Sequence, residues 1–261
     1  MENDDFPTGW GEDLLTDFQH KAFANELWSF AHDSELTKLL SECDSLIFDT
    51  LLKVFPKPTE EANLGSLLFV NSHNHFRAAA RLCMSGQCLP VYPTARACLE
   101  TAVYGWYLIT NPNMVKVWGN KPVDKEELRK WSQTFKFSSI VKLIGKEDPT
   151  SAKTFIELHQ ITIDFGAHPN AKSLWSNLLP HPENKELRRV NYMHSTGHLF
   201  DYTFNNMFDV GLGVLILIKL AHKTLDTDED FIYKFNAIRS IAMSQRSLFK
   251  MKLTLSPNAS L

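Results

Sequence analysis

The chain has 261 residues, of which 44% are hydrophobic and 22% are charged, an ordinary balance for a globular protein with a large core. Its 27 basic and 30 acidic residues leave a net charge of −3, so no overall basic field attracts nucleic acid, although a local basic patch is compatible with this count. The first residues are acidic and polar, which does not fit a secretory signal peptide.

The cysteines and the longest apolar run lead us to expect a cytoplasmic protein without a membrane span. The four cysteines fall inside helical patterns, which favours reduced, buried thiols over a disulfide scaffold. The apolar run at 210–221 contains Lys219 and is shorter than the roughly 20 residues that span a bilayer. We interpret it as a core helix.

Hydrophobic spacing predicts an all-α fold of about seven helices in a single domain at 13–261, after a flexible segment at 1–12 pinned at most by Trp10. The first helix is expected at about 13–31. Ser34 can cap the second, whose apolar positions recur every three or four residues. These positions are Leu36, Leu39, Leu40, Cys43, Leu46, Ile47, Leu51 and Val54.

The chain is organised around a predicted helical hairpin with a turn near Gly86, a residue suited to ending a helix. Asn71 and His75 occupy apolar positions of the first helix, at about 60–85. Polar residues at positions where the pattern predicts apolar ones are often found at functional sites. The alternative is that the Asn71 amide and the His75 imidazole lie in the core and form hydrogen bonds with their neighbours. The second helix is expected at about 95–109, after two prolines.

Four further helices are expected downstream. Their predicted bounds are 124–144, 148–165 with Asp148 as its cap, 196–225, and a last helix opened by Thr227 and Asp230 as a capping box. Residues 170–186 look irregular. A weak alternation at 187–194 predicts a short β-strand.

Four charged residues of the hairpin are candidates for one shared binding cluster. Arg96 and Glu100 are four residues apart on one helix, and Arg77 and Arg81 have the same spacing on the other. Guanidinium groups oriented by a carboxylate suit a phosphate or carboxylate ligand, so the cluster predicts a small-anion site. The other interpretation, which is the more common one for charges of this kind, is an ion-pair network that only ties helices together.

His75 and His168 are added to this candidate binding site as polar partners or acid–base groups. No metal site is predicted. His73 and His75 point in different directions on a helix, and His194 and His198 have a ligand spacing but no nearby carboxylate or cysteine. No motif indicates a cofactor or a familiar enzyme class.

A second candidate site is the Arg-x4-His pattern formed by Arg189 and His194. In this spacing and in its helix content, the chain resembles the HEPN-type ribonucleases, all-helical proteins in which such a pair cleaves RNA at a dimer cleft. The resemblance implies that Arg189 and His194 act on the phosphodiester and its 2′-hydroxyl without a metal. The sequence departs from the family by placing the pair at a predicted strand rather than a helix.

A second resemblance covers roughly residues 64–225. The turn glycine, the Arg96-x3-Glu100 pattern and Gly-x-His168-Pro together resemble a family of bacterial all-helical proteins, itself distantly HEPN-like. This family has no established activity, so the resemblance implies a fold and no reaction.

We therefore expect a cytoplasmic, homo-oligomeric helical binding protein, in a bacterial stress or defence setting. Its ligand or partner would meet the polar cluster, a small anion is the favoured ligand class, and neither a membrane nor a cofactor is involved. The main alternative is a HEPN-type ribonuclease acting on RNA. A third hypothesis is an enzyme of small anions that uses His75 or His168 as its base. The position of the cluster residues relative to one cavity distinguishes these hypotheses.

Overall fold

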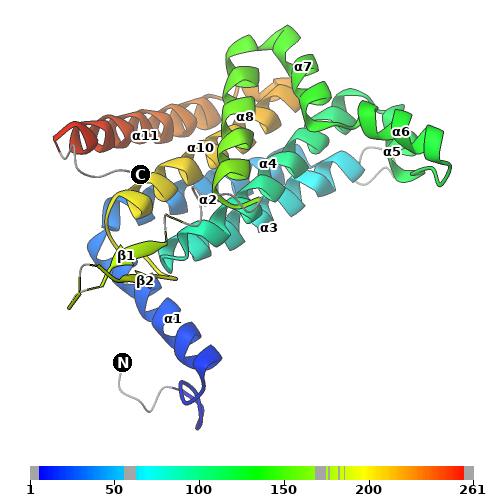
Figure 1. Ribbon diagram of the computed structural model, residues 1–261. Helices are drawn as coiled ribbons and strands as arrows, with labels where there is room; N and C mark the ends of the chain where they lie inside the picture. The colour runs from blue at the N-terminus through cyan, green and yellow to red at the C-terminus, as the bar shows by residue number, and fades with distance from the viewer. Residues whose placement is uncertain are drawn as a thin grey trace.

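The computed structural model describes residues 6–55, 63–167, 175, 177–181, 183–184 and 186–255, and it confirms the predicted all-α fold with a short β excursion (Figure 1). The helices are α1 (Leu14–His32), α2 (Ser34–Val54), α3 (Asn63–Met84), α4 (Cys88–Thr110), α5 (Met114–Gly119), α6 (Lys125–Thr134), α7 (Phe137–Glu147), α8 (Pro149–Thr162), α10 (His198–Ala221) and α11 (Glu229–Leu255). The strands β1 (Leu178–Pro180) and β2 (Arg188–Val190) pair antiparallel.

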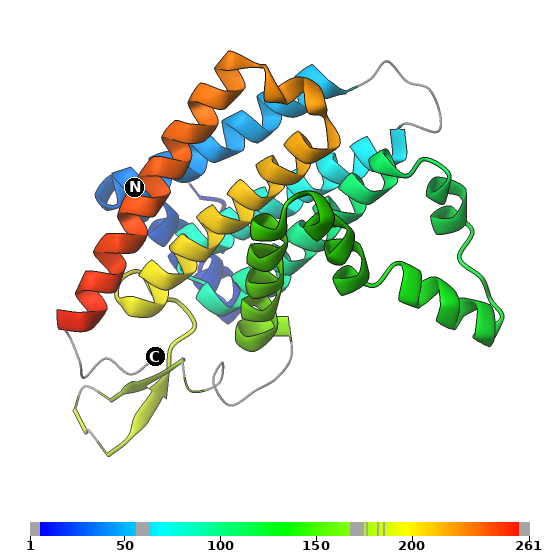
Figure 2. The ribbon, with the colours of Figure 1, turned by 90° about the horizontal axis from the view of Figure 1, so that it is seen from above.

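The central helix of the bundle is α10. Figure 2 shows it between α11 and α8, and it also contacts α2, α3 and α4. It is long and apolar enough to pass for a membrane span by length and composition, but 67% of its most apolar window is buried inside the bundle. A helix that is apolar on nearly all sides is expected at the centre of a bundle, as the sequence indicated.

The hairpin of α3 and α4 packs closely because glycines face each other across it. A Cβ on Gly105 would lie 3.0 Å from the carbonyl oxygen of Gly65, so no larger side chain fits between the two backbones. The turn residue Gly86 has a φ of 79°, which confirms its predicted left-handed conformation. The two helices of the hairpin therefore pack closely on each other, and α1, α2 and α10 pack against them.

Helix α4 begins at Cys88, seven residues before the predicted start, and Pro93 lies inside it. Proline has no N–H to donate to the carbonyl of Leu89. A π-helical turn after α8 packs over this point, where a Cβ on Gly166 would lie 3.0 Å from the Leu89 oxygen. The interrupted turn of α4 therefore lies under a tertiary neighbour, and this packing could not be predicted from the sequence.

The buried face of α3 is offset by about one residue from the predicted one, which contained Asn71 and His75. Asn71 is exposed and His75 is half-buried, whereas Phe69, His73 and Phe76 are buried. Because α3 contacts α1, α2, α4 and α10, several of its faces carry apolar residues, and spacing alone does not single out one. The apparent violation of the core pattern at Asn71 and His75 therefore disappears.

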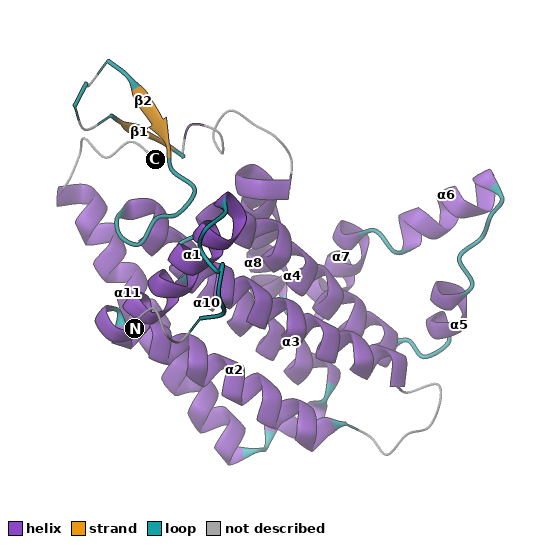
Figure 3. Ribbon diagram, turned by 90° about the horizontal axis from the view of Figure 1, so that it is seen from below, coloured by secondary structure: helices purple, strands orange, loops and turns teal. Residues whose placement is uncertain are grey.

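The helix predicted at 124–144 is two helices, α6 and α7, separated at Phe135. Phe135 is buried in the core, and its carbonyl accepts a hydrogen bond from the hydroxyl of Tyr104. The chain must turn there to insert this ring. Figure 3 shows α5 and α6 extending away from the bundle.

Helix α1 is attached mainly at its C-terminal half. Asn25 Nδ2 donates to the carbonyl of Ser85, and Ser29 Oγ donates to that of Met84, so α1 satisfies backbone oxygens at the end of α3. Residues 6–12 fold back on α1 through Phe6, whose ring lies edge-on to those of His20 and Phe23. The sequence indicated only Trp10 as a contact of this segment.

Candidate functional site

The first of the predicted binding arginines, Arg77, faces α2. Its Nε donates to Asp44 Oδ1 at 2.8 Å and one Nη donates to Oδ2 at 3.0 Å, while His73 Nε2 lies 2.7 Å from the same carboxylate. Although burial opposes this, the hydrogen bonds from His73 and Arg77 lower the pKa of Asp44 to about 2. Asp44 is therefore an ionised junction between α2 and α3.

Arg81, one helical turn further along α3, faces α1. Its Nε donates to Glu26 Oε1 at 3.1 Å, and most of the Arg81 side chain is exposed. No other hydrogen bond from its guanidinium is found within the described residues. The pair bridges α1 and α3 where α1 leaves the bundle.

The second predicted pair, Arg96 and Glu100, faces α8. Arg96 Nε donates to Glu100 Oε1 at 2.8 Å, and His159 Nε2 lies 2.8 Å from the same oxygen. The imidazole of His159 stacks on Phe137 with ring centroids 4.0 Å apart. Burial opposes ionisation of Glu100, yet hydrogen bonds from His159 and Arg96 hold the pKa of this carboxyl below its usual value.

The predicted cluster is therefore not one site. Arg77 belongs to the α2 junction, Arg81 to the α1 junction and the Arg96–Glu100 pair to the α8 junction. His75 makes no hydrogen bond with a described residue, and His168 lies outside the described residues. The expectation that the hairpin's charged groups point to a shared spot is wrong, because α3 and α4 present them to three different neighbouring helices.

Arg77 and Arg81 nevertheless share one groove, formed by α1, α2 and α3. Its volume is about 760 Å³. The buried side chains of Leu40 and Phe76 form its floor, and the exposed ring of Phe30 stands at its edge. We call this the α1–α2–α3 groove. Its remaining lining residues are Glu26, Thr37, Lys38, Ser41, Glu42, Asp44, Ala80 and Met84.

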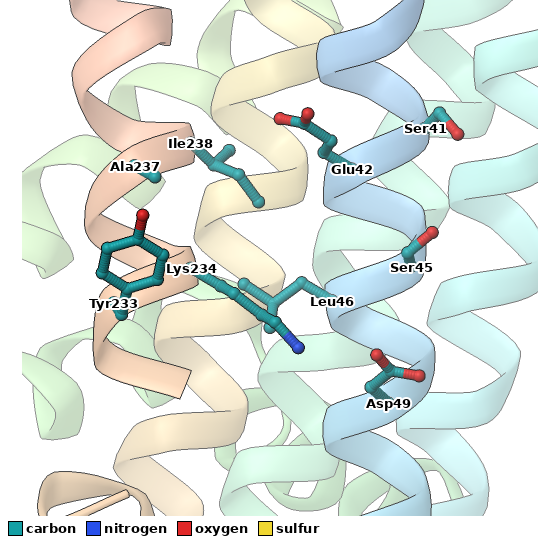
Figure 4. Close-up of a pocket in the computed structure, with 9 residues that line it drawn as sticks. All are labelled: Ser41, Glu42, Ser45, Leu46, Asp49, Tyr233, Lys234, Ala237 and Ile238. Atoms are coloured by element: carbon teal, nitrogen blue, oxygen red, sulfur yellow. The ribbon is translucent and has the colours of Figure 1, made fainter. Parts of the chain in front are cut away.

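A smaller groove of about 380 Å³ lies on the other side of α2, facing α11 (Figure 4). Ser41 and Glu42 line both grooves. Figure 4 shows Lys234 extending from α11 towards the α2 side that carries Asp49, and its ammonium is ion-paired with Asp230 at 3.1 Å. Its lining contains none of the arginines and histidines that the sequence predicted as site residues.

Arg189 and His194, the candidate ribonuclease pair, lie in different environments. Arg189 is exposed on β2, whereas His194 is buried. The two ring nitrogens of His194 lie 3.3 Å from Asn177 Oδ1 and 3.4 Å from Asn191 Nδ2, and desolvation lowers the pKa of the imidazole. This geometry does not support a joint catalytic site.

Several charged residues that the sequence analysis did not name lie at these junctions and in a further cleft. Asp44, Glu26 and His159 complete the three ion pairs of the hairpin. Asp209 is ion-paired with Arg246 between α10 and α11. A signal for Asp209 existed, because it is a carboxylate directly before the apolar run at 210–221.

Among the described residues, no three histidine, cysteine or acidic side chains gather in a way that could hold a metal ion. The four cysteines are free and buried, and burial raises the pKa values of the Cys88 and Cys98 thiols to about 12. Thiols protonated at neutral pH are poor nucleophiles.

Searches for similar proteins found no matching family model, no matching curated protein and no matching solved structure. The resemblances to HEPN-type ribonucleases and to a bacterial helical family therefore stay predictions from short motifs.

Proposed function

We propose that this protein is a protein-binding module whose α1–α2–α3 groove receives an amphipathic helix with acidic side chains. The observation that carries the proposal is an open groove lined by the exposed ring of Phe30 and by two arginines on one face of α3. A helix laid in a hydrophobic groove is a common mode of peptide recognition, in which apolar anchors supply the affinity and charged neighbours select the partner.

The apolar part of the groove supports this proposal. Phe30 is 70% exposed on α1, although a large aromatic side chain gains free energy when it is removed from water. Met84, at the end of α3, lines the same groove, and methionine adapts its shape to different partner side chains. A partner helix would cover both side chains together with the floor.

The unused N–H groups of the two arginines support acidic side chains on the partner, although the lining as a whole is neutral, with Lys38, Arg77 and Arg81 against Glu26, Glu42 and Asp44. Arg81 donates only through Nε to Glu26, and Arg77 donates through Nε and one Nη to Asp44, so each guanidinium has further N–H groups without a partner in the described chain. Residues four apart on a helix are about 6 Å apart. Two carboxylates with the same spacing on a partner helix would match Arg77 and Arg81.

A direct test uses a fluorescent helical peptide of about 18 residues, with leucines on one face and glutamates four residues apart on its edge. We expect saturable binding to the intact protein, measured by fluorescence anisotropy. Phe30→Asp should weaken it by at least about tenfold, because the anchor's contact area is lost and a carboxylate faces the peptide's acids. Arg81→Gln should weaken it and reduce its dependence on salt.

Leu14→Ser is the matched control, since Leu14 is also an exposed apolar residue of α1 but lies outside the groove. It should leave the affinity unchanged. Equal affinity for a peptide with lysines in place of the glutamates would contradict an acidic partner. A protein that is dimeric in sedimentation and becomes monomeric with Phe30→Asp would show that the groove holds a second copy, and that result would overturn the proposed partner.

A further inference from the structure

A second cleft lies on the opposite part of the bundle, between α8, α10 and α11, and has a volume of about 500 Å³. Both α8 and α11 contact α10, so α10 forms its base (Figure 2). At this base Gly213 allows α8 to approach closely, because a Cβ there would lie 3.3 Å from the ring of Phe155. Its volume lies within the range of sites that bind small molecules.

The α11 wall carries two arginines seven residues apart, which places them two helical turns apart on one face. Arg246 is ion-paired with Asp209, whose side chain is only 12% exposed. Arg239 is exposed and has no ion-pair or hydrogen-bond partner among the described residues. The cleft therefore contains one guanidinium paired with a mostly buried carboxylate and one that is available to a ligand.

The remaining charges of the lining set the charge of a suitable ligand. Lys219 is ion-paired with Asp226 at 3.2 Å, and Asp148 accepts hydrogen bonds from the backbone and side chain of Ser151 at the start of α8. The ion pairs Lys219–Asp226 and Arg246–Asp209 each cancel, so Arg239 is the cation of the described lining that has no ion-pair partner. A monoanion can pair with Arg239, whereas a dianion would bring a second negative charge into a lining that also contains the carboxylate of Asp148.

The rest of the lining is mostly apolar. Phe155 lies on the α8 side, Leu212 and Ile216 on α10, and Phe235 and Met243 on α11, within one turn of Arg239 on either side. When the head group of a ligand binds Arg239, the rest of the ligand would therefore contact these apolar side chains and be shielded from water. Guanidinium groups bind carboxylates through two parallel hydrogen bonds, which fixes the head group in one orientation.

We propose that the α8–α10–α11 cleft is a binding site for a carboxylic acid with an apolar body, with Arg239 as the residue that binds its carboxylate. The site is independent of the α1–α2–α3 groove, since the two share no lining residue. It assigns a ligand class to residues that no motif in the sequence indicated.

The test is isothermal titration of the intact protein with octanoate at neutral pH. We expect one saturable site and at least about tenfold weaker binding of octylamine, which has the same chain and the opposite charge. Octyl phosphate, largely dianionic at this pH, should also bind more weakly because Asp148 and Asp209 repel its second charge.

Arg239→Gln should weaken octanoate binding by at least about tenfold without lowering the melting temperature, because Arg239 stabilises no other residue. Arg129→Gln is the matched control, since Arg129 is an exposed arginine of α6 outside the cleft. Thr154→Trp, which places a large ring into the cleft from α8, should abolish binding.

Three results would overturn the proposal. These are an absence of octanoate binding up to millimolar concentrations, an unchanged dissociation constant in the Arg239→Gln variant, and octylamine or octyl phosphate binding as tightly as octanoate. None of them bears on the acidic-helix groove.

Discussion

The backbone N–H of His194 donates a hydrogen bond of 2.7 Å to the carbonyl of Gly86. The segment that follows the β-hairpin is therefore attached to the turn between α3 and α4, although the two residues are far apart in the sequence. Gly86 serves two purposes here. Its left-handed backbone ends α3, and its missing side chain lets the backbone of His194 approach.

Gly86→Ala should lower the free energy of unfolding by about 2 kcal/mol or more. The left-handed conformation is unfavourable for alanine, and its Cβ would lie 2.7 Å from the carbonyl oxygen of His194. Urea unfolding measures this change. Gly119→Ala is the control, because no heavy atom lies within 4 Å of a Cβ built there, and it should change stability by less than about 1 kcal/mol. Equal effects of the two substitutions would contradict the close contact with His194.

Ionisation of Asp44 should make the free energy of unfolding fall as the pH is lowered into the acid range. Its pKa is about 2 in the folded protein, below its ordinary value of 3.8, so the ionised form stabilises the fold above about pH 4 and this contribution is lost as pH falls towards 2. Asp44→Asn should cost about 1–2 kcal/mol at neutral pH after allowance for solvent screening, and almost nothing near pH 2.

Urea titrations of both proteins at several pH values measure this difference. The control is Asp49→Asn, a substitution of an exposed residue on the same helix that forms no ion pair within the described residues. A difference between wild type and Asp44→Asn that stays constant from pH 7 to pH 2 would refute the role given to the His73–Asp44–Arg77 junction.

Arg96 and Glu100 should contribute to stability and not to ligand binding. Glu100→Gln weakens the hydrogen bonds to Arg96 and His159 at once and should lower the free energy of unfolding by about 1–2 kcal/mol. Neither this variant nor Arg96→Ala should change the affinity for the acidic helix or for octanoate. The exposed pair Lys153–Glu157 on α8 provides the control, since removing it should cost less than about 0.5 kcal/mol. A binding defect with an unchanged melting temperature would return Arg96 and Glu100 to the binding site predicted from the sequence.

Arg246→Met should lower stability more than the double substitution Asp209→Leu with Arg246→Met. The single change leaves the mostly buried carboxylate of Asp209 without its cation, at a cost of about 2 kcal/mol or more, whereas the double change removes both charges. A double-mutant cycle of thermal unfolding measures the coupling. If the two effects simply add, the two residues do not depend on each other in solution.

The sequence predicted the helical class well because apolar spacing is a local property. Leu39, Cys43, Leu46 and Ile47 are buried on one face of α2, as their spacing indicated. Local capping groups were more difficult. Asp148 caps α8 as predicted, but the last helix is capped by Asp228, whose carboxylate accepts from the N–H of Phe231, rather than by Thr227. Adjacent polar residues compete for the same role, and only backbone geometry selects one.

In the candidate site, sequence spacing predicts contacts within one helix but not contacts between helices. Spacing correctly placed Arg96 beside Glu100, because i,i+4 neighbours are fixed by the helix itself. Spacing could not place Arg77 beside Asp44 or Arg81 beside Glu26, because those pairs join helices whose relative rotation depends on how whole faces pack.

The sequence by itself thus determined which segments are helical, where the hairpin turns and that the apolar stretch near the C-terminus lies in the core. Only the tertiary structure decided that the hairpin's charges serve three separate junctions and that the α1–α2–α3 groove and the α8–α10–α11 cleft exist. The physical reason is the distance along the chain over which each interaction acts. Helix periodicity and turn conformation arise within a few residues, whereas a cleft forms only where helices distant in the chain pack against a common neighbour such as α10.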